Sequence, residues 1–177
     1  VNTEKTTAGP LFFPRLGLCC TFSQEPIRFR TTTVRYASSL SVKDKKKFLY
    51  TIAQENIDSL SNAIFWCIKN GIYAFRVKSD LLPLVTHPEH GYTFDALDPK
   101  GLLREKLLNI RMHAKNADIR LSFHPDQFVV PGSVRPEVVQ SSLKEIEYQA
   151  LLAEYLGATN ITLHGGGAQD GKLNALE

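Results

Sequence analysis

The sequence lacks the features that mark several specialised classes of protein. Its 177 residues include one tryptophan, one methionine and three cysteines, and the cysteines Cys19, Cys20 and Cys67 form no CxxC pair. A low, odd cysteine count without a secretory signal predicts reduced thiols and a cytoplasmic protein. No run of about 18 uncharged apolar residues occurs, so the sequence predicts no membrane-spanning helix and no membrane partner.

A strong excess of charge of one sign is also missing. Twenty-one Lys and Arg residues stand against 18 Asp and Glu residues, which gives a formal net charge of +3 at pH 7. A balance this mild permits a nucleic-acid partner without requiring one. Apolar residues make up 43% of the chain, as in ordinary globular proteins, and this share excludes a chain that is disordered throughout.

Hydrophobic periodicity predicts three long helices that alternate with short strands. After a cluster of lysines (43 and 45–47), apolar residues recur at gaps of three and four from Leu49 to Ile68. The same spacing recurs over 102–114 and 138–156, which predicts amphipathic helices in all three places. Short apolar runs predict strands at 15–20, 72–77, 119–123 and 160–163.

This alternation predicts the α/β class, with a parallel sheet and helices packed outside it. Residues 1–14 are expected to form a flexible N-terminal tail, and residues 15–177 a single domain. The connections 23–41 and 79–99 are expected to be irregular.

Three histidines lie where a parallel α/β sheet builds its sites. His124 directly follows the predicted strand 119–123, His164 ends the strand 160–163, and His87 lies on the connection after 72–77. Because the carboxyl ends of parallel strands meet at one edge, these imidazoles can converge there. Neutral imidazole is a common ligand for divalent metals, although a histidine after a strand can also simply cap its loop.

Two further segments near this edge suggest a nucleic-acid partner. Gln127 and Phe128 follow His124, and an exposed aromatic ring there could wedge against an unstacked base. Composition alone favours the other interpretation, in which Phe128 belongs to the core with its valine neighbours. The basic segment 28–36 could contact phosphates or form a solvated loop. The glycines 165–167 match neither a dinucleotide fingerprint nor a P-loop.

Six motifs together resemble the UV damage endonuclease family. The resemblance runs from residue 15 to residue 177, and Ser-Phe-His-Pro-x-Gln followed about 40 residues later by Leu-His-x-Gly-Gly is its most specific part. The motifs are Arg15–Cys20, Arg28–Thr33, Phe75–Asp80, Thr86–Pro88, Leu121–Phe128 and Leu163–Gly166. The resemblance implies a TIM barrel that hydrolyses, with divalent metal ions, the phosphodiester 5′ to UV photoproducts and other lesions.

The resemblance also implies roles for individual residues. His87, His124 and His164 match metal ligands, and the metal implied is manganese, with zinc or magnesium as alternatives. Gln127 and Phe128 fall where the family inserts a Gln-Tyr pair into damaged double-stranded DNA, and Phe128 lacks the tyrosine hydroxyl. Two basic residues of the Phe75–Asp80 motif, Arg76 and Lys78, are implied to bind DNA. Leu18 stands where many relatives carry a tyrosine that contacts the damaged bases.

The number of strand–helix units departs from the family pattern. Four predicted strands cannot close a barrel of eight, so the chain is expected to be the N-terminal half of an enzyme that is a monomer when full length. The remaining metal ligands would lie beyond residue 177, and the fragment is therefore expected to be inactive. Two alternatives stay open: a metal-dependent sugar isomerase or epimerase, and a non-catalytic DNA-binding remnant.

Overall fold

The computed structural model describes residues 15–165; the predicted tail 1–14 and residues 166–177 lie outside the described part. Four parallel strands form one sheet in the order of the sequence, β1-β2-β3-β4. The alternation of strands and helices predicted from periodicity is thus confirmed. The strands are β1 (Gly17–Cys19), β2 (Ala74–Arg76), β3 (Arg120–Phe123) and β4 (Asn160–Ile161), each shorter than its predicted run.

The three predicted long helices are present, and two short ones were not predicted. The long helices are α2 (Val42–Lys69), α4 (Leu102–Asn116) and α5 (Pro136–Leu156). The short helices α1 (Val34–Ser38) and α3 (Phe94–Leu97) lie in connections expected to be irregular. Gly157 ends α5 with φ +67°, a left-handed conformation that a glycine adopts without strain. No helix in the described part of the chain is long and apolar enough to cross a membrane.

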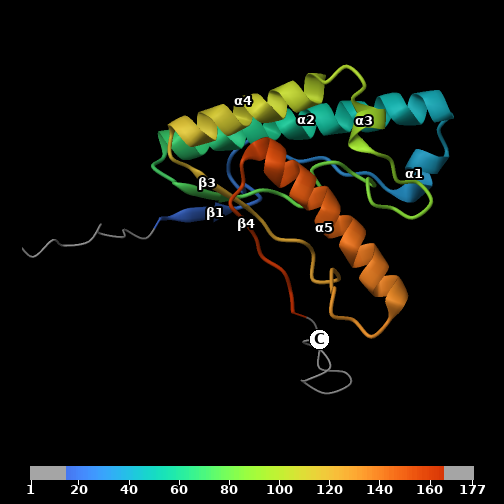
Figure 1. The fold of residues 1–177 in the computed structure, drawn as a ribbon. Helices are drawn as coiled ribbons and strands as arrows, with labels where there is room; N and C mark the ends of the chain where they lie inside the picture. Colours follow the sequence, from blue (N-terminus) through green and yellow to red (C-terminus); the bar gives the residue numbers. More distant parts are fainter. Residues whose placement is uncertain (1–14, 166–177) are drawn as a thin grey trace, which may run out of the picture.

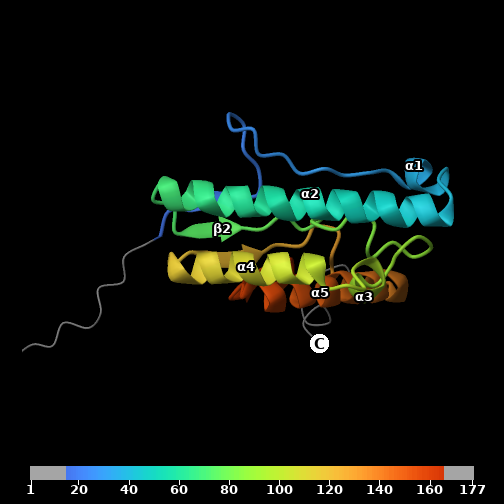
Figure 2. The ribbon, with the colours of Figure 1, turned by 90° about the horizontal axis from the view of Figure 1, so that it is seen from above.

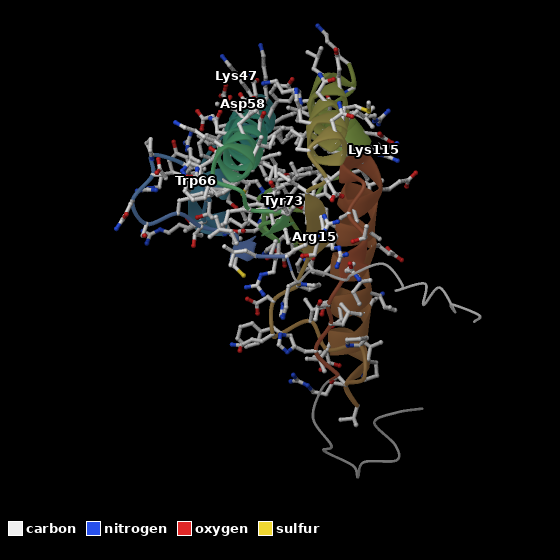
Figure 3. The ribbon with its side chains drawn as sticks, turned by 90° about the vertical axis from the view of Figure 1, so that its left-hand side faces the viewer. Arg15, Lys47, Asp58, Trp66, Tyr73 and Lys115 are labelled. Carbon is white, nitrogen blue, oxygen red and sulfur yellow. The ribbon has the colours of Figure 1, made fainter. Side chains whose placement is uncertain are left out.

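Within residues 15–165, the long helices cover one face of the sheet and leave the other face bare (Figure 1). Helices α2 and α4 pack side by side over the strands, and α5 packs against α4 and β3 (Figure 2). Seen end on, Lys47 and Asp58 on α2 and Lys115 on α4 lie on the outer helical side, while Arg15 and Tyr73 lie at the sheet (Figure 3).

Side chains of the central strands alternate between these two faces. Phe75, Leu121 and Phe123 are almost completely buried under the helices, because successive residues of a strand point to opposite sides. Arg76 and Ser122 therefore lie on the bare face and are only half-buried. The core beneath the helices is continuous from α2 to α5. Its largest fully buried members are Phe75, Phe123, Ile57, Leu60, Ile64, Leu81, Leu82, Leu103, Leu107, Leu121 and Leu152.

A buried asparagine on α2 attaches two connections to the core. The Asn56 side chain is fully buried, and its Oδ1 accepts a hydrogen bond from the Arg30 backbone N–H at 2.7 Å. Its Nδ2 donates to the carbonyl oxygens of Arg30 and Leu81, both at 2.9 Å. Because all three partners are backbone groups, removal of the amide would leave buried polar atoms unpaired.

We expect Asn56→Ala to lower the free energy of unfolding by about 3 kcal/mol, because several buried hydrogen bonds are lost together. Gln54→Ala, at an exposed position of the same helix, is the matched control and should change stability by less than about 0.5 kcal/mol. Urea denaturation followed by circular dichroism measures both. Equal stabilities of the two variants would contradict the role assigned to Asn56.

Candidate metal-binding and nucleic-acid-binding site

The structure brings His124 and His164 together at the carboxyl end of the sheet. Phe123 pairs with Ile161 in the parallel β3–β4 register, and the Thr162 backbone N–H donates to the Phe123 carbonyl oxygen at 3.0 Å. The chain beyond β4 therefore continues alongside residue 124. The two imidazole rings meet edge to face, with 4.8 Å between ring centroids. Two imidazoles this close can serve one divalent cation.

Within residues 15–165, the hydrogen bonding of His124 engages one ring nitrogen and leaves the other for a ligand. Its Nδ1 lies 2.8 Å from the Pro125 carbonyl oxygen. A carbonyl oxygen only accepts, so Nδ1 carries the proton and the lone pair of the neutral ring lies on Nε2. This backbone contact orients metal-binding histidines in many proteins. His164 is exposed and faces the half-buried His124 across the strand ends.

The structure does not bring His87 to this pair. The His87 Nδ1 accepts the backbone N–H groups of Glu89 and His90, both at 3.2 Å, and its ring stacks on His90 with 5.0 Å between centroids. The lone pair of Nδ1 is thus occupied, and in the neutral ring Nε2 carries the proton. Across residues 15–165, no group of three or more His, Cys, Asp or Glu side chains could hold a metal together.

The loop after His124 exposes Phe128 and buries its neighbour. The Phe128 side chain is 77% exposed, whereas Val129 is only 7% exposed. The interpretation of Phe128 as a core residue, which composition favoured, is therefore wrong. The Asp126 carboxylate accepts the Phe128 N–H at 3.0 Å, and the Val130 N–H donates to the Ser142 hydroxyl of α5 at 2.8 Å. The backbone is held while the aromatic ring stays in solvent.

Phe128 lines two cavities together with other predicted site residues. One, of about 460 Å³, is lined by Phe128 together with Lys78, Asp80 and Glu145. A smaller one, of about 180 Å³, is lined by Gln127 and Phe128 together with Arg135. Gln127 and Phe128, the pair predicted to insert into DNA, thus line the smaller cavity together, and Lys78 lines the larger one.

The other predicted DNA-binding residues lie close to the bare face of the sheet. Strand register places Arg76 in one row with Cys19, Ser122 and Asn160. The Arg76 Nε–H is buried and has no hydrogen-bond partner in the described residues. Lys78, two residues after the end of β2, forms an ion pair with Asp80.

Two arginines of the basic segment 28–36 contact groups of the protein itself at its surface. Arg28 donates to the carbonyl oxygens of Phe22, at 2.9 Å, and Ile27, at 3.1 Å, and Arg30 pairs with Glu55. Leu18 is half-buried and packs against the hydrophobic core. The first two arginines of this segment are therefore engaged by groups of the protein in this structure.

Sequence reasoning missed two residues of α5 that shape this region. Glu145 accepts hydrogen bonds from the Thr86 hydroxyl and the Gln149 amide, each at 2.8 Å, and lines the larger cavity beside Phe128. Tyr148 accepts the Leu82 N–H at 2.9 Å. Burial raises the pKa of Tyr148 well above its usual range, and the carboxylates of Glu145 and Asp80 add to the rise. The helical spacing of α5 marks both only as ordinary helix positions.

The geometry defines an α/β chain of TIM-barrel type, with paired imidazoles at its strand ends and an exposed aromatic ring on the adjoining loop. The sequence profile of the family described as UV-endonuclease UvdE matches residues 14–177. The crystal structure of SacUVDE superposes with a TM-score of 0.78 at 32% identity, over 92% of this chain and 53% of that one.

Curated relatives agree with this match. The UV DNA damage endonuclease of Clostridium perfringens is 34% identical over 92% of this chain, and that of Deinococcus radiodurans is 32% identical over 92%. The matched region covers 38% and 54% of those proteins. The chain thus spans about half the length of its relatives or less, and it belongs to the UV-endonuclease UvdE family.

Because Phe128 is exposed and Val129 is buried, truncation of the Val129 side chain should lower stability much more than truncation of the Phe128 side chain. We expect Phe128→Ala to change the free energy of unfolding by less than about 0.5 kcal/mol. Val129→Ala should lower it by about 2 kcal/mol, because buried methyl groups are lost. Urea denaturation measures the stability of both variants. A Phe128→Ala protein as unstable as Val129→Ala would contradict the exposed position of Phe128.

Proposed function

We propose that this chain supplies the metal-ligating and lesion-binding part of an endonuclease that cuts damaged double-stranded DNA 5′ to UV photoproducts. The observation that carries the proposal is the meeting of His124 and His164 at the strand ends, 4.8 Å apart between ring centroids. Family membership supports the same reaction class, since relatives bear the name UV DNA damage endonuclease.

The donor set fits a divalent cation, with manganese proposed first and zinc or magnesium as alternatives. His124 offers Nε2 because its Nδ1 lies against the Pro125 carbonyl oxygen, and the His164 ring lies directly beside it. A bound divalent cation supplies activated water and charge stabilisation for phosphodiester hydrolysis. His87 would join these two only after the loop that carries it gave up the hydrogen bonds at its Nδ1.

The protein's own contribution to lesion recognition lies on the loop beside the imidazoles. The Phe128 ring is exposed on a backbone held by Asp126 and Ser142, so its insertion between bases costs little reorganisation. Gln127 lies next to it along the smaller cavity. Arg76 carries a buried N–H that has no partner among the described residues and could bind phosphate, whereas Lys78 must first release Asp80.

We expect the 177-residue polypeptide to bind Mn²⁺ weakly and not to nick UV-irradiated supercoiled plasmid, because two imidazoles leave the cation short of protein ligands. His124→Ala and His164→Ala should each weaken Mn²⁺ binding by roughly tenfold or more. His113→Ala, an exposed histidine of α4, is the control and should leave binding unchanged. Electron paramagnetic resonance of free Mn²⁺ measures binding.

Two results would contradict this prediction. Mn²⁺ binding that survives the loss of both strand-end histidines would place the metal elsewhere. Robust nicking that a chelator abolishes would show that this polypeptide already contains a complete metal centre.

The lesion-binding role predicts selective binding of UV-irradiated duplex over undamaged duplex. Phe128→Ala should reduce that selectivity by roughly fivefold or more, because base–aromatic stacking contributes about 1–3 kcal/mol. Phe65→Ala, a half-exposed aromatic on α2, is the matched control. Fluorescence anisotropy at two salt concentrations measures both affinity and its electrostatic part.

The same titration separates the proposed nuclease part from a non-catalytic DNA-binding remnant. The finding that favours the remnant is the small donor set, because residues 15–165 contain no group of three or more His, Cys, Asp or Glu side chains that could hold a metal. A remnant that uses Gln127, Phe128 and the segment 28–35 binds DNA without metal and with a steep dependence on salt, and it keeps this binding when His124 and His164 are replaced by alanine. Equal affinity of the unmodified protein for damaged and undamaged duplex would overturn lesion recognition in either case.

A further inference from the structure

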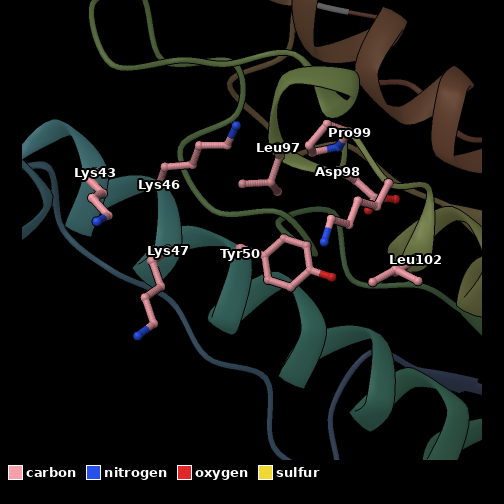
Figure 4. Close-up of a pocket in the computed structure, with 9 residues that line it drawn as sticks. Lys43, Lys46, Lys47, Tyr50, Leu97, Asp98, Pro99 and Leu102 are labelled. Carbon is pink, nitrogen blue, oxygen red and sulfur yellow. The ribbon is translucent and has the colours of Figure 1, made fainter.

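A cavity on the helical side of the molecule shares no residue with the site described above. It lies between the first half of α2 and the segment that joins α3 to α4, and its volume is about 440 Å³. Its walls are largely apolar and include Tyr50, Leu97 and Leu102 (Figure 4). A volume of this size is within the range of small-molecule sites, about 300–1,000 Å³.

Four lysines line the cavity, and in the described part of the chain the only acidic side chain beside them in its lining is that of Asp98. Its lysine residues are Lys43, Lys46, Lys47 and Lys100. None of the four forms an ion pair within the described residues. Three of them crowd the first two turns of α2, where like charges at helical spacing repel one another. An anionic group at the rim of the cavity would relieve that repulsion.

A buried carboxylate oxygen without a partner lines the same cavity. Asp98 is 2% exposed, and its Oδ2 accepts the Arg104 backbone N–H at 3.0 Å at the start of α4. Its Oδ1 is buried and has no hydrogen-bond partner among the described residues. A buried acceptor without a hydrogen bond destabilises the folded protein. A ligand that donates a hydrogen bond to Oδ1 would remove this cost.

Tyr50 provides a flat aromatic surface in the cavity that Asp98 also lines. Figure 4 shows its ring on α2 next to the cavity, with Asp98 across from it. Burial raises the pKa of the Tyr50 hydroxyl, and the Asp98 carboxylate makes a smaller contribution in the same direction. The hydroxyl is therefore protonated at pH 7. An aromatic ligand could pack on this ring while its polar edge reached Asp98.

We propose that this cavity binds a small phosphorylated heteroaromatic molecule of the mononucleotide type. The ring would pack against Tyr50 and Leu102, a ring N–H or amino group would donate to Asp98 Oδ1, and the phosphate would lie among the lysine ammonium groups. The three features, an apolar slot, one unpaired acceptor and a cationic rim, match the three parts of such a ligand. The inference does not depend on the proposed nuclease chemistry.

Isothermal titration calorimetry of the 177-residue chain with adenosine 5′-monophosphate tests the proposal. We expect saturable binding, with adenosine and inorganic phosphate each at least about tenfold weaker, because each lacks one of the recognised parts. Asp98→Asn keeps an oxygen for the Arg104 N–H but replaces Oδ1 by a donor. It should weaken nucleotide binding by roughly tenfold while the fold is retained.

Two lysine variants test the cationic rim. Lys46→Gln and Lys47→Gln should each weaken binding by about twofold to fivefold and reduce its salt dependence, as expected for exposed ion pairs. Lys69→Gln, on the last turn of the same helix and away from the cavity, is the control and should have no effect.

The proposal is overturned by any of three results. These are no saturable binding of the nucleotide at millimolar concentration, binding that the Asp98 and lysine variants leave unchanged, and binding of a single-stranded oligonucleotide without binding of the free nucleotide. The last result would make the cationic rim a contact for nucleic acid. None of the three bears on the strand-end histidines.

Discussion

The parallel pairing of β3 with β4 is the constraint on which the candidate site depends. Burial of Leu121 and Phe123 under the helices forces Ser122 and His124 onto the opposite face, because side chains alternate along a strand. The Phe123–Ile161 register then carries the chain beyond β4 past His124, toward His164. A shift of the β3 register by one residue would turn His124 toward the core. The free energy gained by burying Phe123 therefore also fixes the position of the His124 imidazole.

In the loop after β3, two adjacent residues have different roles: Val129 contributes to the stability of the fold, and Phe128 is available to contact a partner. Val129 takes the buried position, and hydrogen bonds to Asp126 and Ser142 hold the backbone around it. Phe128 is thereby left in solvent, where a large apolar ring contributes little to folding. An exposed aromatic on a held backbone can contact a partner without first leaving the core.

Much of the architecture follows from periodicity. The long helices were predicted because apolar spacing of three and four persists over many turns, as it does in α2. The short helices α1 and α3 escaped detection because five and four residues carry no measurable period. A capping signal was nevertheless present, since the side chains of Thr33 and Thr93 accept the N–H groups of Tyr36 and Ala96.

The order of the elements, the parallel sheet and the location of His124 and His164 at strand ends were determined by the sequence alone, since each depends on local spacing. Tertiary structure alone decided that these two rings meet while His87 stacks on His90, that Val129 rather than Phe128 is buried, and that Asp98 lines one cavity with four lysines. The physical reason is that loop paths depend on contacts between segments distant in sequence, and local periodicity contains no information about those contacts.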